Sequence, residues 1–232
     1  MTAQGTSSKG AFTPALGFNA LTPVYDLAIA IFTRERIWRT RLIDAIDPNP
    51  NDLILDIGCG TGSLAHFIDQ ACSSASYLGL DPDEQAVNIA KKRAQQKSIA
   101  ARFVTGFFDG SETVEGNRPN KIVTSLVLHQ TPLPEKRRII KQAYDLLPVG
   151  GVLIIADYGE QKTALMRFLF RWTVQALDGL DDTQPNADGV LPDLLKDTGY
   201  TDISQTATVP TPSGSISVLH ASKGLQDGGQ PA

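Results

Sequence analysis

The chain has 232 residues, a net charge of −4 and only two cysteines. This length suits one α/β domain with a sizeable buried core. The weakly acidic balance disfavours a nucleic-acid partner, and two cysteines are too few for a disulfide framework or a cysteine-rich metal site. With no signal-peptide pattern and no apolar run of membrane-spanning length, we expect a reduced, cytoplasmic protein without stable membrane insertion.

The first two thirds of the chain alternate between apolar runs and helical patterns. Between expected mobile tails at residues 1–20 and 224–232, we predict a single domain over residues 21–223. Strands are expected at 53–57, 77–81, 103–104, 122–127 and 152–156. Helices are expected at 24–46, 63–71, 83–97 and 135–147. This alternation predicts an α/β fold with a doubly wound, mostly parallel sheet, and the helix at 24–46 is an N-terminal cap.

The last third has a different pattern. Residues 162–177 predict an amphipathic helix whose apolar face comprises Leu165, Phe168, Leu169, Trp172 and Ala176. A polar stretch at 178–189 is expected to break this helix, and a short helix follows at about 190–197. Two alternating runs, 202–209 and 215–221, are joined by Pro-Thr-Pro-Ser-Gly and predict a C-terminal antiparallel hairpin.

The most informative segment is LILDIGCGTGSL, residues 53–64. Asp56 lies near the exit of a buried strand, and Gly58, Gly60 and Gly62 follow at alternate positions, where a ligand can approach bare backbone. A tight turn without a ligand is the alternative. A dinucleotide fingerprint needs its third glycine at the position of Ser63, and a P-loop needs a lysine that is absent.

This segment resembles motif I of the class I S-adenosylmethionine-dependent methyltransferases, which have a seven-stranded Rossmann-like sheet. The resemblance implies S-adenosylmethionine as the cofactor and S-adenosylhomocysteine as the product, with Asp56, Gly58, Cys59, Gly60 and Gly62 around the cofactor. Asp81 ends the second strand, and the resemblance assigns it to the ribose and Pro82 to packing near the adenine. A helix N-cap is the alternative role for Asp81.

Two later segments complete the implied cofactor site. The loop after the third strand contains Phe107, Phe108 and Asp109, which the resemblance places at the adenine edge. Two core aromatic residues and a turn aspartate are the alternative. Ser125 and Leu126 end the fourth strand and would flank the methionine portion of the cofactor.

The transfer site is expected at the end of the same fourth strand. His129 would face the methyl group there, and a hydrogen-bonded core histidine is the alternative. Tyr25-Asp26 and Arg36-Ile37-Trp38-Arg39 resemble the N-terminal signature of the ubiquinone/menaquinone-biosynthesis C-methyltransferases. In that signature Glu35 replaces a histidine and Arg39 replaces a lysine. We therefore expect Tyr25, Asp26 and His129 to converge near the methyl group, with Tyr25 also covering the cofactor. A helix-capping aspartate and a packed tyrosine are the alternative.

These features predict an S-adenosylmethionine-dependent methyltransferase that acts on a small, hydrophobic or aromatic molecule by C-, O- or N-methylation. Residues 160–190 are expected as a lid insertion whose apolar face lines the acceptor site, and an ordinary sheet-covering helix is the alternative. A non-catalytic binder of S-adenosylmethionine or S-adenosylhomocysteine is the competing function. No metal is required, a general base is needed only if the acceptor loses a proton, and a monomer or homodimer is expected.

Overall fold

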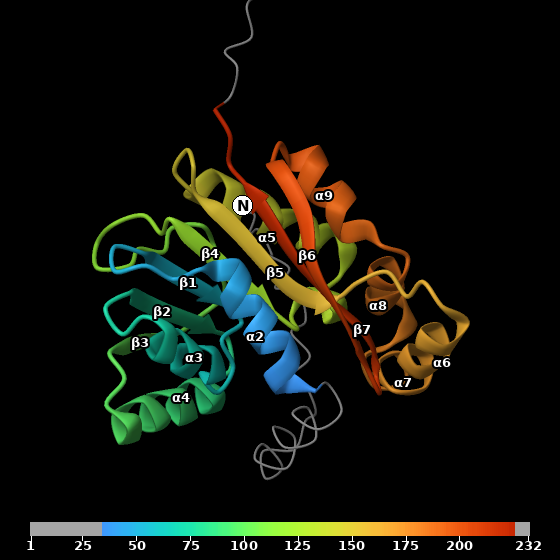
Figure 1. Ribbon diagram of the computed structural model, residues 1–232, viewed down its shortest axis with the longest axis horizontal. Helices are drawn as coiled ribbons and strands as arrows, with labels where there is room; N and C mark the ends of the chain where they lie inside the picture. The colour runs from blue at the N-terminus through green and yellow to red at the C-terminus, as the bar shows by residue number, and fades with distance from the viewer. Residues whose placement is uncertain (1–33, 226–232) are drawn as a thin grey trace, which may run out of the picture.

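The computed structural model describes residues 34–225 and contains one seven-stranded sheet (Figure 1). The strand order is β3-β2-β1-β4-β5-β7-β6. The strands are β1 (Leu53–Ile57), β2 (Ser76–Asp81), β3 (Ala101–Thr105), β4 (Lys121–Ser125), β5 (Val152–Tyr158), β6 (Thr201–Thr211) and β7 (Gly214–Ser222). β1 to β5 are parallel, and β7 lies antiparallel to both β5 and β6. The predicted doubly wound sheet with a C-terminal hairpin is confirmed.

Helices cover both faces of this sheet (Figure 1). On one face, α2 (Glu35–Ile46), α3 (Ser63–Ala71) and α4 (Glu84–Lys97) share a hydrophobic core with alternate strand residues such as Ile54. On the other, α5 (Leu133–Leu146) and α9 (Val190–Thr198) share a second core with Leu55. Because successive strand side chains point to opposite faces, both cores draw on the same short strands. No helix in residues 34–225 is long and apolar enough to cross a membrane.

The N-terminal cap is described only in part. α2 begins at Glu35 and buries Trp38, Leu42 and Ile46, so the helical pattern expected for 24–46 is confirmed from Glu35 onward. The rest of that expected helix lies outside the described residues. The first core cluster includes Trp38 together with Cys59 and Leu64, so α2 packs beside the glycine turn.

The polar stretch that was predicted to interrupt the amphipathic helix contains a helix of its own. The polar stretch 178–189 contains α8 (Leu180–Ala187), which follows α7 (Val174–Asp178). Thr183 and Asn186 are fully buried, and the Asn186 amide donates a hydrogen bond of 2.9 Å to the Tyr158 carbonyl. The break itself occurs at Gly179, which ends α7, but the stretch after it is helical. Its polar side chains are buried with hydrogen-bond partners, which the local sequence pattern does not reveal.

The predicted amphipathic helix is present as α6 (Ala164–Trp172), but its apolar face points away from the sheet. Leu165, Phe168 and Trp172 are 61%, 59% and 69% exposed. Phe170, on the opposite face, is 1% exposed and packs against the Tyr158 ring with a centroid distance of 5.1 Å. The helix thus packs on the sheet through Phe170 and not through the predicted apolar face, and whether residues 160–190 are a lid or an ordinary sheet-covering helix stays a prediction.

Candidate functional site

The candidate site lies at the edge of the sheet where the parallel strands end. Asp56 lies in β1, Asp81 ends β2, and a short 3-10 helix, η1 (Leu128–Gln130), follows β4. Asp157 lies near the end of β5. Ligands of open α/β sheets bind at this carboxyl edge, so the chain order of the predicted residues brings most of them to one place.

The three positions of the turn are occupied by glycine for different structural reasons. All have positive φ, at +75° for Gly58, +52° for Gly60 and +77° for Gly62. A Cβ at Gly58 would lie 2.3 Å from a Val127 methyl carbon, and one at Gly62 would lie 2.8 Å from the Ala90 Cβ. A Cβ at Gly60 would have no neighbour within 4 Å. Gly58 and Gly62 thus permit close packing, whereas Gly60 borders open space that a ligand can enter.

Asp81 is tied to the glycine turn. Its Oδ2 accepts a hydrogen bond of 2.8 Å from the Gly60 N–H, and its Oδ1 accepts one of 2.9 Å from the Asp83 N–H. The N-cap of α4 is Asp83, so the alternative that Asp81 caps this helix is wrong. Each Asp81 oxygen keeps a second lone pair, so the carboxylate can also accept ribose hydroxyls. Burial raises its pKa.

Asp56 is the most deeply buried carboxylate of the turn, with 1% exposure. Its Oδ2 accepts a hydrogen bond of 2.5 Å from the Tyr77 hydroxyl, while its Oδ1 has no hydrogen-bond partner among the described residues. Burial raises the pKa of Asp56 to about 6, against the opposing effects of the Tyr77 hydrogen bond and the Arg39 charge. A buried acceptor without a donor is costly, so this oxygen fits a ligand that supplies one.

The two neighbouring phenylalanines in the loop after β3 lie in different environments. Phe107 is 61% exposed, whereas Phe108 is buried in the second core. Asp109 accepts hydrogen bonds from the Ser111 N–H (2.9 Å) and hydroxyl (2.6 Å), which lower its pKa. The alternative of a core aromatic residue and a turn aspartate therefore describes Phe108 and Asp109, and Phe107 alone presents an exposed ring for stacking.

The turn after β4 is organised by a carboxylate that the sequence did not identify. Asp157 Oδ2 accepts the backbone N–H groups of Val127, Leu128 and His129 at 3.1, 2.7 and 3.2 Å. Its other oxygen lies 2.7 Å from His129 Nδ1. Leu126 precedes this turn with a left-handed φ of +55°. The only sequence signal for Asp157 is its place at the end of an apolar strand.

His129 lies between two carboxylates. It is 6% exposed, and its Nε2 lies 3.5 Å from Asp178 Oδ2 on α7. Burial alone would lower its pKa, but Asp157 and Asp178 together raise it to about 9. An imidazolium with both nitrogens protonated cannot accept a proton at neutral pH. The alternative of a hydrogen-bonded core histidine describes these contacts, and the base role of His129 stays a prediction.

Lys136 joins the same turn to α8. Its buried ammonium donates to the carbonyls of Leu128 and Thr131, both at 2.5 Å, and of Asp182 at 2.7 Å. Burial lowers its pKa to about 8. A lysine on an amphipathic helix is ordinarily exposed to solvent, so the sequence around Lys136 did not indicate that it is buried.

For the remaining predicted site residues, the structure shows burial or position but few contacts. Cys59 is buried, and burial raises the pKa of its thiol, so it behaves as a small apolar residue. Pro82 and Ser125 are half-buried at the carboxyl edge. Tyr25 and Asp26 lie outside the described residues, so their convergence on His129 stays a prediction.

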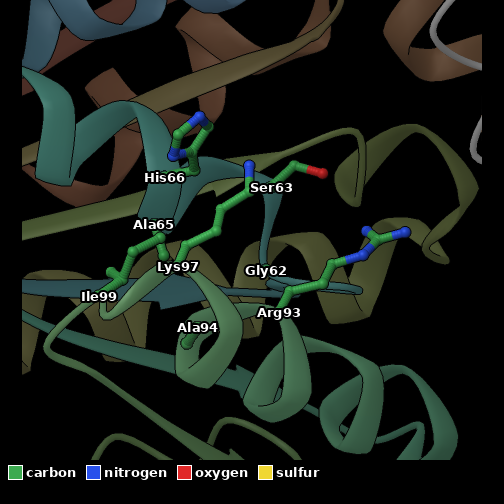
Figure 2. Close-up of a pocket in the computed structure, with 8 residues that line it drawn as sticks. All are labelled: Gly62, Ser63, Ala65, His66, Arg93, Ala94, Lys97 and Ile99. Atoms are coloured by element: carbon green, nitrogen blue, oxygen red, sulfur yellow. The ribbon is translucent and has the colours of Figure 1, made fainter.

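A depression of about 190 Å³ lies between α3 and α4 (Figure 2). Figure 2 shows Lys97 extending from α4 toward Ser63 of α3, whereas the Arg93 guanidinium points away from His66. Its lining includes Gly62 but neither Asp56 nor Asp81. The depression is therefore distinct from the carboxylate-lined edge.

The fold and this edge define an α/β protein whose glycine turn and strand-end carboxylates suit an adenosine-containing ligand. Residues 54–151 match a family model described as a methyltransferase domain. The chain is 24% identical over 170 residues to the ubiquinone/menaquinone biosynthesis C-methyltransferase UbiE of Geotalea daltonii, covering 67% of each chain. It is 29% identical to the demethylmenaquinone methyltransferase of Thermus thermophilus, covering 61% of this chain and 64% of that one.

A solved structure has the same fold. Magnesium protoporphyrin IX methyltransferase from Synechocystis PCC 6803, with bound S-adenosylhomocysteine, superposes with a TM-score of 0.58 at 23% identity over 82% of both chains. Residues 54–151 thus match a methyltransferase domain, and the chain is similar to class I S-adenosylmethionine-dependent methyltransferases, among them the UbiE C-methyltransferases. The methyltransferase domain indicates an enzyme, and the similarity to S-adenosylmethionine-dependent methyltransferases supports S-adenosylmethionine as the cofactor. The alignments span about two thirds of the length of the two quinone-pathway relatives.

Proposed function

We propose that this enzyme transfers the methyl group of S-adenosylmethionine to a small hydrophobic or aromatic molecule. The observation that carries the proposal is the open carboxyl edge, where Gly60, Asp56 and Asp81 lie together. The names of the relatives refer to quinones and a porphyrin, which are extended apolar ring systems. An acceptor of that class, with a ring carbon or an oxygen as its nucleophile, is the leading candidate.

The cofactor supplies an activated methyl group on a sulfonium. The protein therefore has to bind the cofactor and the acceptor, orient them for transfer and exclude water. Asp81 would hold the ribose hydroxyls, and Gly60 lets the cofactor approach the backbone. The Val127–His129 turn, fixed by Asp157, would line the methionine side. Because His129 is held between two carboxylates, this arrangement favours an acceptor that enters already ionised or needs no base.

We infer that residues 160–190 form the lid of the acceptor site. This segment leaves the carboxyl edge from β5, and α6, α7 and α8 lie together beyond the tip of that strand (Figure 1). Two contacts tie the segment to the turn after β4: Asp178 pairs with His129, and the Asp182 carbonyl accepts a hydrogen bond from Lys136. The exposed apolar face of α6 supports closure around a hydrophobic acceptor, because such a face gains free energy when it is covered.

The test is methyl transfer from S-[methyl-¹⁴C]adenosylmethionine to a panel of reduced naphthoquinols, benzoquinols, phenols and alkylamines. We expect label to enter at least one ring acceptor, and Asp81→Ala to lose this transfer. Binding of S-adenosylhomocysteine without transfer to any acceptor would favour the competing function, a non-catalytic binder. Light scattering during size-exclusion chromatography would test the expected monomer or homodimer.

A further inference from the structure

Exposed apolar side chains gather on the helices that follow β5. Within residues 34–225, five of the ten large hydrophobic side chains that are exposed lie on α6, α7 and α8. They are Leu165, Phe168, Trp172, Leu177 and Leu180. These helices pack one against the next and lie at the outer margin of the molecule, away from the sheet (Figure 1). Apolar surface that gathers on one segment is typical of an interaction surface, whereas scattered residues are not.

Three of these side chains form an apolar row along α6. Leu165, Phe168 and Trp172 follow one another at spacings of three and four residues, which places them on one face of the helix. The rings of Phe168 and Trp172 have a centroid distance of 6.2 Å. Phe170 fixes the other side of α6 by packing against Tyr158. The apolar row is therefore held outward by the fold.

Two arginines accompany the apolar row. Arg167 and Arg171 are exposed and lie four residues apart, so both are on the same side of α6. At about 100° per residue, that side borders the apolar row. The Arg167 Nε donates a hydrogen bond of 2.8 Å to the Gln161 carbonyl. The helix, ALMRFLFRW, contains no acidic residue, although the chain as a whole has a net charge of −4. The apolar row thus has a local positive border on an acidic protein.

This combination fits the surface of a lipid bilayer that contains anionic lipids. Helices that lie in the membrane interface combine tryptophan, phenylalanine and leucine on one face with basic residues beside it. The arginine stems can lie along the acyl boundary while their guanidinium groups reach the headgroups. A helix of nine residues is too short to span a bilayer, so α6 would lie on its surface. A two-fold interface with a second copy would instead gather four arginines.

We propose that α6 docks the protein on an anionic bilayer and that a hydrophobic acceptor enters the site from there, an inference that rests on the acceptor class of the proposed function. The docking surface is continuous with the transfer region. Asp178 on α7, six residues after Trp172, has its Oδ2 3.5 Å from His129 Nε2. An apolar acceptor concentrates in a bilayer, so docking through α6 brings its reservoir beside the segment proposed as the lid.

The experiment measures flotation of the full chain with vesicles of phosphatidylcholine alone and of an equimolar phosphatidylglycerol–phosphatidylcholine mixture. We expect the wild type to bind the anionic vesicles more tightly and added salt to weaken that binding. Phe168→Ala/Trp172→Ala should lower the partition coefficient at least about tenfold, because two large apolar contacts are lost. Arg171→Gln should lower it about fivefold on anionic vesicles and hardly at all on neutral ones.

Val149→Ala/Leu225→Ala is the matched control, because these two exposed side chains lie near the opposite edge of the sheet, before β5 and after β7. It should bind vesicles as the wild type does. No binding of the wild type to either vesicle, or equal losses in the two double variants, would overturn the proposal. A dimer that Phe168→Ala/Trp172→Ala dissociates, without vesicle binding, would assign the face to a second copy instead. Vesicle binding without methyl transfer to any acceptor would refute only the proposed function.

Discussion

The ion-pair cluster around His129 makes the stability of the protein depend on pH. Its pKa is raised from an ordinary 6.5 to about 9, because Asp157 and Asp178 outweigh burial. A raised pKa in the folded state adds stability that is fully present below about pH 6.5 and is lost as the pH rises through 9. Each pKa unit corresponds to about 1.4 kcal/mol, so about 2 kcal/mol should disappear between about pH 6 and pH 8.

His129→Gln removes this titration. We expect the free-energy difference between wild type and His129→Gln, measured by urea unfolding, to shrink by about 2 kcal/mol from pH 6 to pH 8. The range ends at pH 8 because Lys136, whose pKa is lowered to about 8, contributes with the opposite sign above it. Asp178→Asn removes one of the two carboxylates and should shift the loss to lower pH. A difference that is the same at both pH values would refute this reasoning.

Three further predictions test the site and the packing that supports it. Asp81→Asn should weaken S-adenosylhomocysteine binding by about 1.5–3 kcal/mol in a folded protein, and an unchanged dissociation constant would contradict its ribose role. Gly60→Ala should lower cofactor affinity at a folding cost of about 1–2 kcal/mol, whereas Gly62→Ala, whose Cβ would clash, should cost about 1–3 kcal/mol more by thermal or urea unfolding. Phe170→Ala should destabilise by about 3–5 kcal/mol and Phe168→Ala by less than about 0.5 kcal/mol, and equal costs would contradict the orientation of α6.

Local sequence features determined what could be predicted. The strand-and-glycine pattern around Asp56 fixed both the parallel sheet and the turn, because strand, turn and helix signals follow one another without a gap. Asp81 was found because it ends the next strand at the same edge. Each of these depends on contacts within a short piece of chain or on one rule of topology.

The missed residues depend on contacts between distant segments. Asp157 binds a turn 28 to 30 residues earlier, and Lys136 reaches a carbonyl 46 residues later. No pattern near either residue indicates those partners. The face of α6 shows the same limit, because an apolar stripe gives the period of a helix but not which face meets the sheet. Phe170, on the opposite face, makes that contact.

The two tryptophans of the chain occupy opposite environments. Trp38 is fully buried beside the guanidinium of Arg39, and Trp172 is 69% exposed on α6. Intrinsic fluorescence therefore carries two separable signals without any added dye. Iodide should quench Trp172 and leave Trp38 emitting at shorter wavelength. Loading of the cofactor can then be followed through Trp38 in a Trp172→Phe variant, and covering of α6 by an acceptor through Trp172 in a Trp38→Phe variant.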